Sequence, residues 1–129
     1  GIKVARNKEG IVLSQRKYSL DLLEETCHLD ARPADFPMEQ RQNLAVGIGV
    51  VVKDAGQYRR IIGRLLYLTI TRPDISYPVQ VLSQFMQDPR VPHLDAAYQV
   101  LRYLKRAPGQ GIFLSSASLL QLTAYCDSD

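Results

Sequence analysis

Residues 58–105 read YRRIIGRLLYLTITRPDISYPVQVLSQFMQDPRVPHLDAAYQVLRYLK, and this stretch decides the fold. Its apolar residues recur at helical spacing in three successive segments, each ending in a proline-containing turn, which predicts three helices. Two of these helices have an apolar face wide enough to bury against a core. The first face comprises Ile61, Leu65 and Leu68, with Ile62, Leu66 and Thr69 beside it, and the other comprises Leu94, Ala97, Leu101 and Leu104.

A second face of the first predicted helix carries the candidate site. Arg60, Gly63, Arg64 and Tyr67 stand at i, i+3, i+4 and i+7 and therefore share one side. A glycine there lowers helix stability by roughly 1 kcal/mol relative to alanine, but it leaves the backbone open to close approach. Two arginines, a gap and an aromatic ring suit the sugar-phosphate backbone of a nucleic acid. The alternative is a solvated basic face whose glycine lets another helix pack close.

Length and charge set the class of protein. The chain has 129 residues, about one domain, and its 46% hydrophobic residues are enough for an ordinary core. The net charge is +3, and it is uneven along the sequence. Residues 1–54 carry eight basic and eight acidic groups, residues 55–106 carry eight and three, and residues 107–129 carry none and two. The basic excess therefore lies on the three predicted helices, where a polyanion is expected to bind.

Two cysteines, Cys27 and Cys126, are far apart and belong to no CxxC or Cys/His cluster. They support neither a zinc site nor a disulfide framework and favour a reducing intracellular compartment, cytoplasmic or nuclear. The apolar run Val46–Val52 is much shorter than the roughly 20 residues of a membrane span, so no membrane partner is expected. The polar first residues do not resemble a secretory signal, and the missing initiating methionine indicates a fragment.

The N-terminal third predicts a hairpin followed by a helix. Two short apolar runs flank the turn Asn7–Gly10, whose glycine is expected to adopt positive φ. Ser14 is the expected cap of a helix over Lys17–Leu29, whose acidic cluster we interpret as its wet side rather than a metal or acid/base site. Ala31–Gln57, rich in proline and glycine, is expected to be a connector, with a short strand at Val50–Val52.

The remaining elements complete an α+β prediction. Thr71 is expected to cap the second central helix, in which Pro78 weakens the first turn because it lacks an N–H donor. Two extended runs then predict a C-terminal hairpin; they are Gly111–Ser115 and Leu119–Tyr125. The last strand would place Asp127 and Asp129 on one face, where the pair could share a divalent cation; a surface turn is the commoner meaning of Asp-Ser-Asp.

Several motifs together resemble the Pol polyprotein of copia-type LTR retrotransposons, particularly those of plants. The resemblance covers nearly the whole chain, and Thr-Arg-Pro-Asp-Ile followed at this distance by Leu-Arg-Tyr-Leu-Lys is highly specific. The matching residues are 1–6 (GIKVAR), 13–18 (LSQRKY), 58–60 (YRR) with Gly63, 66–69 (LYLT), 71–75 (TRPDI), His93, 101–105 (LRYLK) and 125–129 (YCDSD).

The resemblance implies a division of the chain. Residues 1–54 would be the end of the reverse transcriptase palm, the first thumb helix and a linker. Residues 55–108 would be the thumb/connection helices that grip the template-primer, and residues 109–129 the first strands of a truncated RNase H domain, with an RNase H-like sheet beginning in the C-terminal hairpin. Asp127 matches the first catalytic and metal-binding aspartate of RNase H, whose acidic partners are missing here. The palm motif Tyr-Val-Asp-Asp would lie upstream of Gly1.

Three hypotheses follow. The leading one is a fragment of a reverse transcriptase/RNase H that grips an RNA–DNA hybrid or duplex without a complete active site, beside the remainder of the Pol polyprotein. Two-metal phosphoryl transfer needs several carboxylates, so Mg²⁺ is expected in the full-length parent, no cofactor is expected for this chain, and the isolated chain is expected to be inactive. The alternatives are a non-catalytic nucleic-acid-binding module and a protein-interaction remnant.

Overall fold

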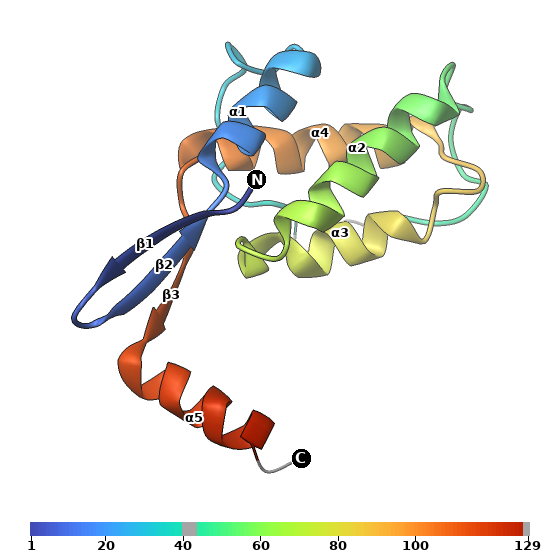
Figure 1. Ribbon diagram of the computed structural model, residues 1–129. Coiled ribbons are helices and arrows are strands. Elements are labelled where there is room, and N and C mark those ends of the chain that lie inside the picture. The colour runs from blue at the N-terminus through green and yellow to red at the C-terminus, as the bar shows by residue number, and fades with distance from the viewer. Residues whose placement is uncertain (40–43, 128–129) are drawn as a thin grey trace.

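The structure, a computed structural model, describes residues 1–39 and 44–127. It combines a small antiparallel sheet with a helical unit, as the α+β prediction requires (Figure 1). In chain order the elements are β1 (Lys3–Asn7), β2 (Gly10–Ser14), α1 (Arg16–Glu25), α2 (Ala55–Leu68), a 3-10 turn (Pro73–Ile75), α3 (Ser76–Ser83), α4 (Val91–Arg106), β3 (Ile112–Ser115) and α5 (Ser116–Asp127).

The three central helices are confirmed as α2, α3 and α4, which pack with α1 around one core. Removal of these apolar side chains from water is the main force that holds the unit together. The predicted apolar faces lie inside, except that Leu66 is 40% exposed and that Thr69 and Leu94 are only partly buried. The core comprises Leu22, Leu23, Tyr58, Ile61, Ile62, Leu65, Leu68, Ile75, Val79, Leu82, Phe85, Ala96, Ala97, Val100, Leu101 and Leu104.

The start of the second central helix differs from the prediction. Thr71 does not cap it; the chain first forms the 3-10 turn, and α3 begins at Ser76. Pro78 is then the third residue of α3, in a first turn whose N–H groups have no partner within the helix. The proline therefore removes no hydrogen bond from α3. The predicted weakening of the first turn does not occur, because the helix starts later than expected.

Two further boundaries move. The cap of α1 is Gln15 rather than Ser14, because Ser14 is still paired in β2. The connector ends at Asp54, whose carboxylate caps α2 by accepting from the backbone N–H of Gln57 at 3.1 Å. Near the connector's end, the expected valine strand is reduced to one antiparallel bridge between Val51 and Arg90.

The N-terminal hairpin is confirmed, with Lys3 opposite Ser14 and Asn7 opposite Gly10. The carboxamide oxygen of Asn7 accepts from the backbone N–H groups of Glu9 and Gly10 and closes the turn. Gly10 does not adopt the positive φ that the sequence predicted, so the turn geometry does not explain why glycine occupies this position. A Cβ at this position would lie 2.1 Å from the carbonyl oxygen of Leu114, so glycine is needed for the close approach of β3.

The predicted C-terminal hairpin is wrong. Ile112–Ser115 does form a strand, but it pairs antiparallel with β2 and gives the sheet order β1-β2-β3. Residues 116–127 form α5 instead of a returning strand. Leucine and alanine, which have high helix propensity, supply five of these twelve residues, and Ser116 starts the helix instead of a turn. The RNase H-like sheet expected for residues 109–129 is therefore not what the structure shows.

Candidate nucleic-acid interface

The outer face of α2 brings Arg60, Gly63 and Arg64 to the edge of a hollow between α1 and α2. Arg60 is the freer cation: its side chain is 71% exposed, and its guanidinium lies 3.7 Å from the Asp54 carboxylate. An ion pair this exposed contributes at most about 1 kcal/mol, so Arg60 can exchange Asp54 for another anion at little cost.

Gly63 leaves a gap in this face. Apart from Gly63 itself, its two chain neighbours and the adjacent backbone of α2, no atom of the described residues lies within 4 Å of the point where a side chain at Gly63 would begin. No helix among the described residues packs against this glycine, and a solvated basic face remains the alternative interpretation. The backbone of α2 is open to approach at this point.

Arg64 is held more firmly. Its Nε donates to the hydroxyl of Tyr18 at 3.3 Å, its guanidinium carbon lies 4.7 Å from the centre of the Tyr18 ring, and it pairs with Glu25. The Tyr67 ring, 39% exposed, lies 4.9 Å from the Tyr18 ring between centroids. Tyr18 thus orders both Arg64 and Tyr67 and belongs to the candidate interface, although the sequence pattern of α2 gave no sign of it.

The hollow has a volume of about 650 Å³, within the size range of small-ligand sites. Buried aliphatic side chains from both helices form its floor, and charged and polar side chains surround the mouth. Its lining residues are Leu22, Glu25, Thr26, Asp54, Gln57, Arg60, Ile61, Gly63 and Arg64.

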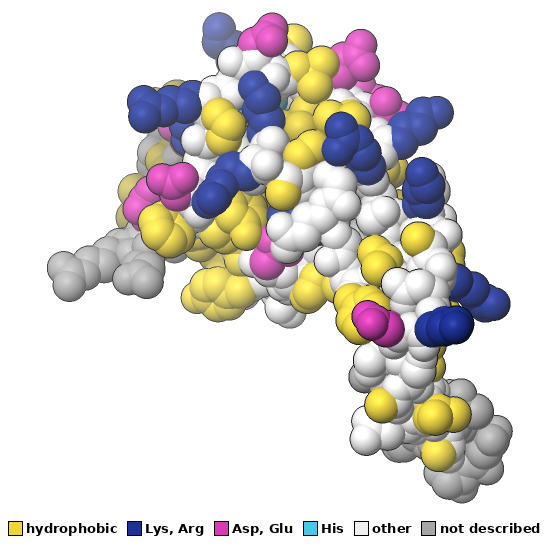
Figure 2. All heavy atoms as spheres, turned by 90° about the vertical axis from the view of Figure 1, so that its left-hand side faces the viewer, with side chains coloured by type: hydrophobic (Ala, Val, Ile, Leu, Met, Phe, Trp, Pro, Cys, Tyr) yellow, Lys and Arg dark blue, Asp and Glu magenta, His cyan; other side chains and the backbone are white. Residues whose placement is uncertain are grey.

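The basic excess of residues 55–106 is largely balanced in space. Arg60, Arg64 and Arg106 pair with Asp54, Glu25 and Asp35, which all belong to the electrically neutral N-terminal segment. Figure 2, which shows the side bearing the sheet, has Lys and Arg side chains spread over the surface with Asp and Glu among them. A polyanion would therefore meet individual exchangeable cations rather than one strong positive field.

The acidic candidates fall at the C-terminal end of the chain. Asp127 is the last residue of α5 and not part of a strand, and its side chain and Asp129 lie outside the described residues. Within the described part of the chain, no group of three or more His, Cys, Asp or Glu side chains is placed to hold a metal ion. No helix in that part is both long and apolar enough to cross a bilayer.

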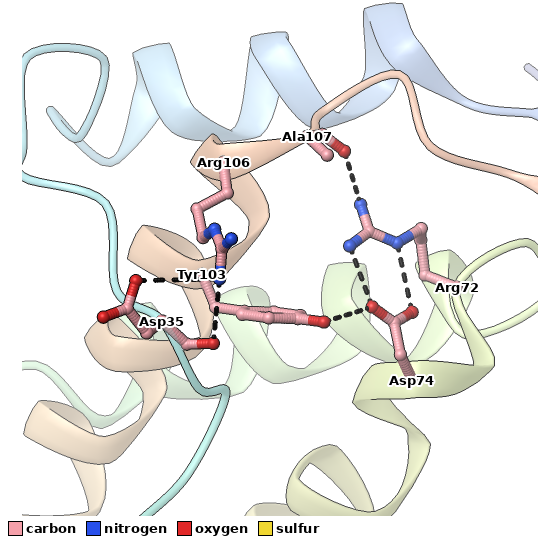
Figure 3. A network of polar contacts seen from close by, with 6 residues as sticks. All are labelled: Asp35, Arg72, Asp74, Tyr103, Arg106 and Ala107. Atoms are coloured by element: carbon pink, nitrogen blue, oxygen red, sulfur yellow. Dashed lines mark hydrogen bonds and ion pairs between the residues drawn. The ribbon is translucent and has the colours of Figure 1, made fainter.

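A buried polar network explains the most specific motif. Arg72 is 2% exposed and forms two hydrogen bonds with Asp74, at 3.1 Å from Nε and 2.9 Å from Nη2 (Figure 3). Its Nη1 donates to the carbonyl oxygen of Ala107 at 2.8 Å, and the Tyr103 hydroxyl donates to Asp74 at 2.7 Å. These hydrogen bonds connect the 3-10 turn, which carries the Thr-Arg-Pro-Asp motif, to α4, which carries the Leu-Arg-Tyr-Leu-Lys motif. We call this set of contacts the Arg72–Asp74 lock.

His93 also has a structural role. Its ring is buried and stacks on Phe85 with centroids 3.9 Å apart. Nδ1 accepts from the backbone N–H of Arg90 at the start of α4, while Nε2 lies 3.0 Å from the carbonyl oxygen of Ala45 and donates to it. The two bonds fix one neutral tautomer and attach the connector to α4.

Acid should weaken the lock. Partial burial acts to raise the pKa of Asp74, but hydrogen bonds from Arg72 and Tyr103 and the charge of Arg72 outweigh it and hold that pKa below its ordinary value. The charged carboxylate thus stabilises the fold fully above its unfolded pKa of about 4, and this contribution is lost as the pH falls through the lower folded pKa. We expect the urea midpoint to drop in this acid window and the drop to be smaller in Asp74→Asn. An equal drop in both proteins would contradict the assignment.

Comparison with known proteins finds several relatives whose similarity covers the whole chain. The chain is 46% identical, over all 129 residues, to the retrovirus-related Pol polyproteins from transposons RE1 and RE2 of Arabidopsis thaliana. Over its whole length the chain is similar to Pol polyproteins from copia-type retrotransposons. It spans 9% of the length of those two polyproteins. It is also 37% identical to an uncharacterised mitochondrial protein of Arabidopsis thaliana and covers 53% of it. No family model matches the chain, and no solved structure matches it significantly.

Proposed function

We propose that this piece of a copia-type Pol polyprotein belongs to the thumb/connection region of the reverse transcriptase and contacts the backbone of an RNA–DNA hybrid or duplex. Residues 1–54 would supply the end of the palm, the first thumb helix and a linker, and residues 55–108 the gripping helices. The contacts would come from Arg60, Gly63, Arg64 and Tyr67.

The observation that carries this proposal is the 46% identity to two Pol polyproteins over the whole length of this chain. The geometry of α2 supports it, because the arginines stand beside an exposed backbone gap and an aromatic ring. Guanidinium groups and backbone N–H groups are usual partners of phosphate oxygens, and aromatic rings pack on sugars and bases.

The proposed role is binding without turnover. Two-metal phosphoryl transfer holds two ions about 3.5–4 Å apart with several carboxylates, and Mg²⁺ would serve the full-length parent. Asp127 would act there as one catalytic and metal-binding position of RNase H, completed by residues elsewhere in the Pol polyprotein. For this chain we propose hybrid binding that needs no divalent cation.

Fluorescence anisotropy with a labelled RNA–DNA hybrid tests the proposal. Binding should weaken steeply as salt rises, because phosphate contacts release counterions. Arg60→Glu should lower the affinity about tenfold or more and flatten the salt dependence. Arg59→Glu is the matched control: it makes the same charge change one residue away, on a side chain whose Nε donates to the carbonyl oxygen of Met86. Affinity indifferent to salt, or an equal loss in both variants, would remove the proposal.

An apolar surface on the connector favours a second candidate, a protein-interaction role. Val50 and Val51 are 73% and 57% exposed and line a hollow of about 350 Å³ together with Val91 and Leu94. Exposed apolar groups of this kind mark association surfaces. Light scattering after size exclusion should show association that rises with concentration and is reduced in Val50→Ser/Val51→Ser; a clean monomer at all concentrations would exclude self-association.

A further inference from the structure

We infer that the hollow between α1 and α2 receives an unpaired nucleotide of the bound strand, so that the chain prefers a hybrid with a single-stranded overhang to a blunt one. The inference rests on the proposed function, since it places the strand at Arg60 and Arg64. It adds a substrate preference that backbone contacts alone do not give.

The hollow has room for a base between two helices. Leu22 from α1 and Ile61 from α2 are 1% and 2% exposed, so they close its inner end and do not form a wide packing surface. A base that enters would lie between side chains of α1 and α2, which shield it from water. With about 650 Å³ available, the hollow can hold a nucleotide but not a base pair with both of its backbones.

The rim offers hydrogen-bonding groups for the edge of a base. Gln57 contributes a carboxamide that can both donate and accept. The Thr26 hydroxyl donates to the carbonyl oxygen of Leu22 at 2.8 Å and keeps lone pairs that can accept from an amino group. A base still paired in a duplex has these edge groups occupied, so the rim favours an unpaired one.

The mouth has a place for the phosphate. Arg60 is joined to Asp54 by a long, exposed ion pair and can turn to a phosphate, whereas Arg64 is fixed by Tyr18 and Glu25 and marks the other side of the opening. Gly63 lies between the two arginines on the same face of α2. With no side chain at this point, the strand has a path from the arginines into the hollow.

Gly63 also provides the test. Leu at this position should be compatible with the fold, because the site is exposed and leucine is a good helix former, yet its side chain would fill the entrance. The wild-type chain should bind a hybrid with a short overhang about tenfold more tightly than the blunt hybrid, the scale expected for one captured base. Abasic residues in the overhang should abolish this preference.

In Gly63→Leu the ratio between the affinities for the overhang hybrid and the blunt hybrid should fall to about one, whatever loss the leucine causes to both affinities by covering the backbone of α2. Gly63→Ala is the matched control; it should retain most of the preference and raise helix stability, and circular dichroism checks that both variants fold. Equal wild-type affinity for blunt, overhang and abasic probes would overturn the inference but leave the proposed function standing, as would a preference that survives in Gly63→Leu. Absence of salt-dependent binding to every probe would remove the proposed function itself.

Discussion

Replacing Asp74 with alanine should lower the free energy of unfolding by about 3–5 kcal/mol, among the largest effects expected of a single substitution in this chain. The change leaves a charged Arg72, 2% exposed in the native fold, with the Ala107 carbonyl as its hydrogen-bond acceptor in the network and the Tyr103 ring centre 5.8 Å away. A buried cation without its counter-ion loses its hydration and recovers little in return. Urea unfolding followed by circular dichroism at neutral pH measures the loss.

Two further variants distinguish the effect of leaving Arg72 without its counter-ion from the effect of lost side-chain packing. Tyr103→Phe removes a single hydrogen bond to Asp74 and should cost about 1.5–3 kcal/mol. Arg72→Met/Asp74→Ala removes both charges and should be more stable than Asp74→Ala alone. If the double variant is the less stable of the two, the stranded guanidinium is not the source of the loss.

Leu65→Ala should cost about 2–5 kcal/mol, whereas Leu66→Ala on the same helix should change stability by less than about 0.5 kcal/mol. Leu65 is 0% exposed and points into the shared core, so truncation leaves a cavity. Leu66 is 40% exposed and leaves none. The two variants remove the same atoms from neighbouring positions of α2, so helix propensity cancels between them.

Thermal and urea unfolding of the two leucine variants would measure the contrast. Losses of similar size would mean that α2 is rotated about its axis relative to the core described above. The candidate interface would then be affected too, because Arg60, Gly63 and Arg64 would no longer border the hollow.

The three central helices could be predicted because periodic burial is a local property of sequence. Leu65 and Leu101 repeat at helical spacing within segments that prolines delimit, and no distant partner is needed to specify them. Leu66 was wrongly predicted to lie beside the buried face, because the sequence of one helix does not define the lateral limits of that face. Only the neighbouring helices decide where burial stops.

The C-terminal region could not be predicted in the same way. Strand β3 finds its partner in β2, about 100 residues earlier, and an apolar run does not say with which strand it pairs. Residues 116–127 alternate too weakly to separate strand from helix, and the composition favoured the helix. Gly10 illustrates the same limit. A glycine is required there because the Leu114 backbone of β3 lies close to it, and not because of the turn that contains it.

The α2 residues of the candidate site could be predicted from the sequence, whereas the α1 residues could not. The helical spacing of Arg60, Gly63, Arg64 and Tyr67 placed them on one face, and the structure agrees. The roles of Tyr18 and Glu25 depend on how α1 lies across α2, which no local pattern encodes. The charge count by segment was misleading for a related reason: three arginines of residues 55–106 pair with acids of residues 1–54, and two of these acids, Glu25 and Asp35, are remote in sequence from their partners.

The three-stranded sheet projects from the helical unit as an arm (Figure 1). The chain enters and leaves it at two places, and each is fastened by a polar bond: Thr71 donates to Gln15 at 2.7 Å where β2 runs into α1, and Arg72 donates to Ala107 shortly before β3. Adjacent residues of one motif thus anchor both crossings. Loss of either bond would therefore release one crossing of the arm from the helical core while the other crossing stays attached.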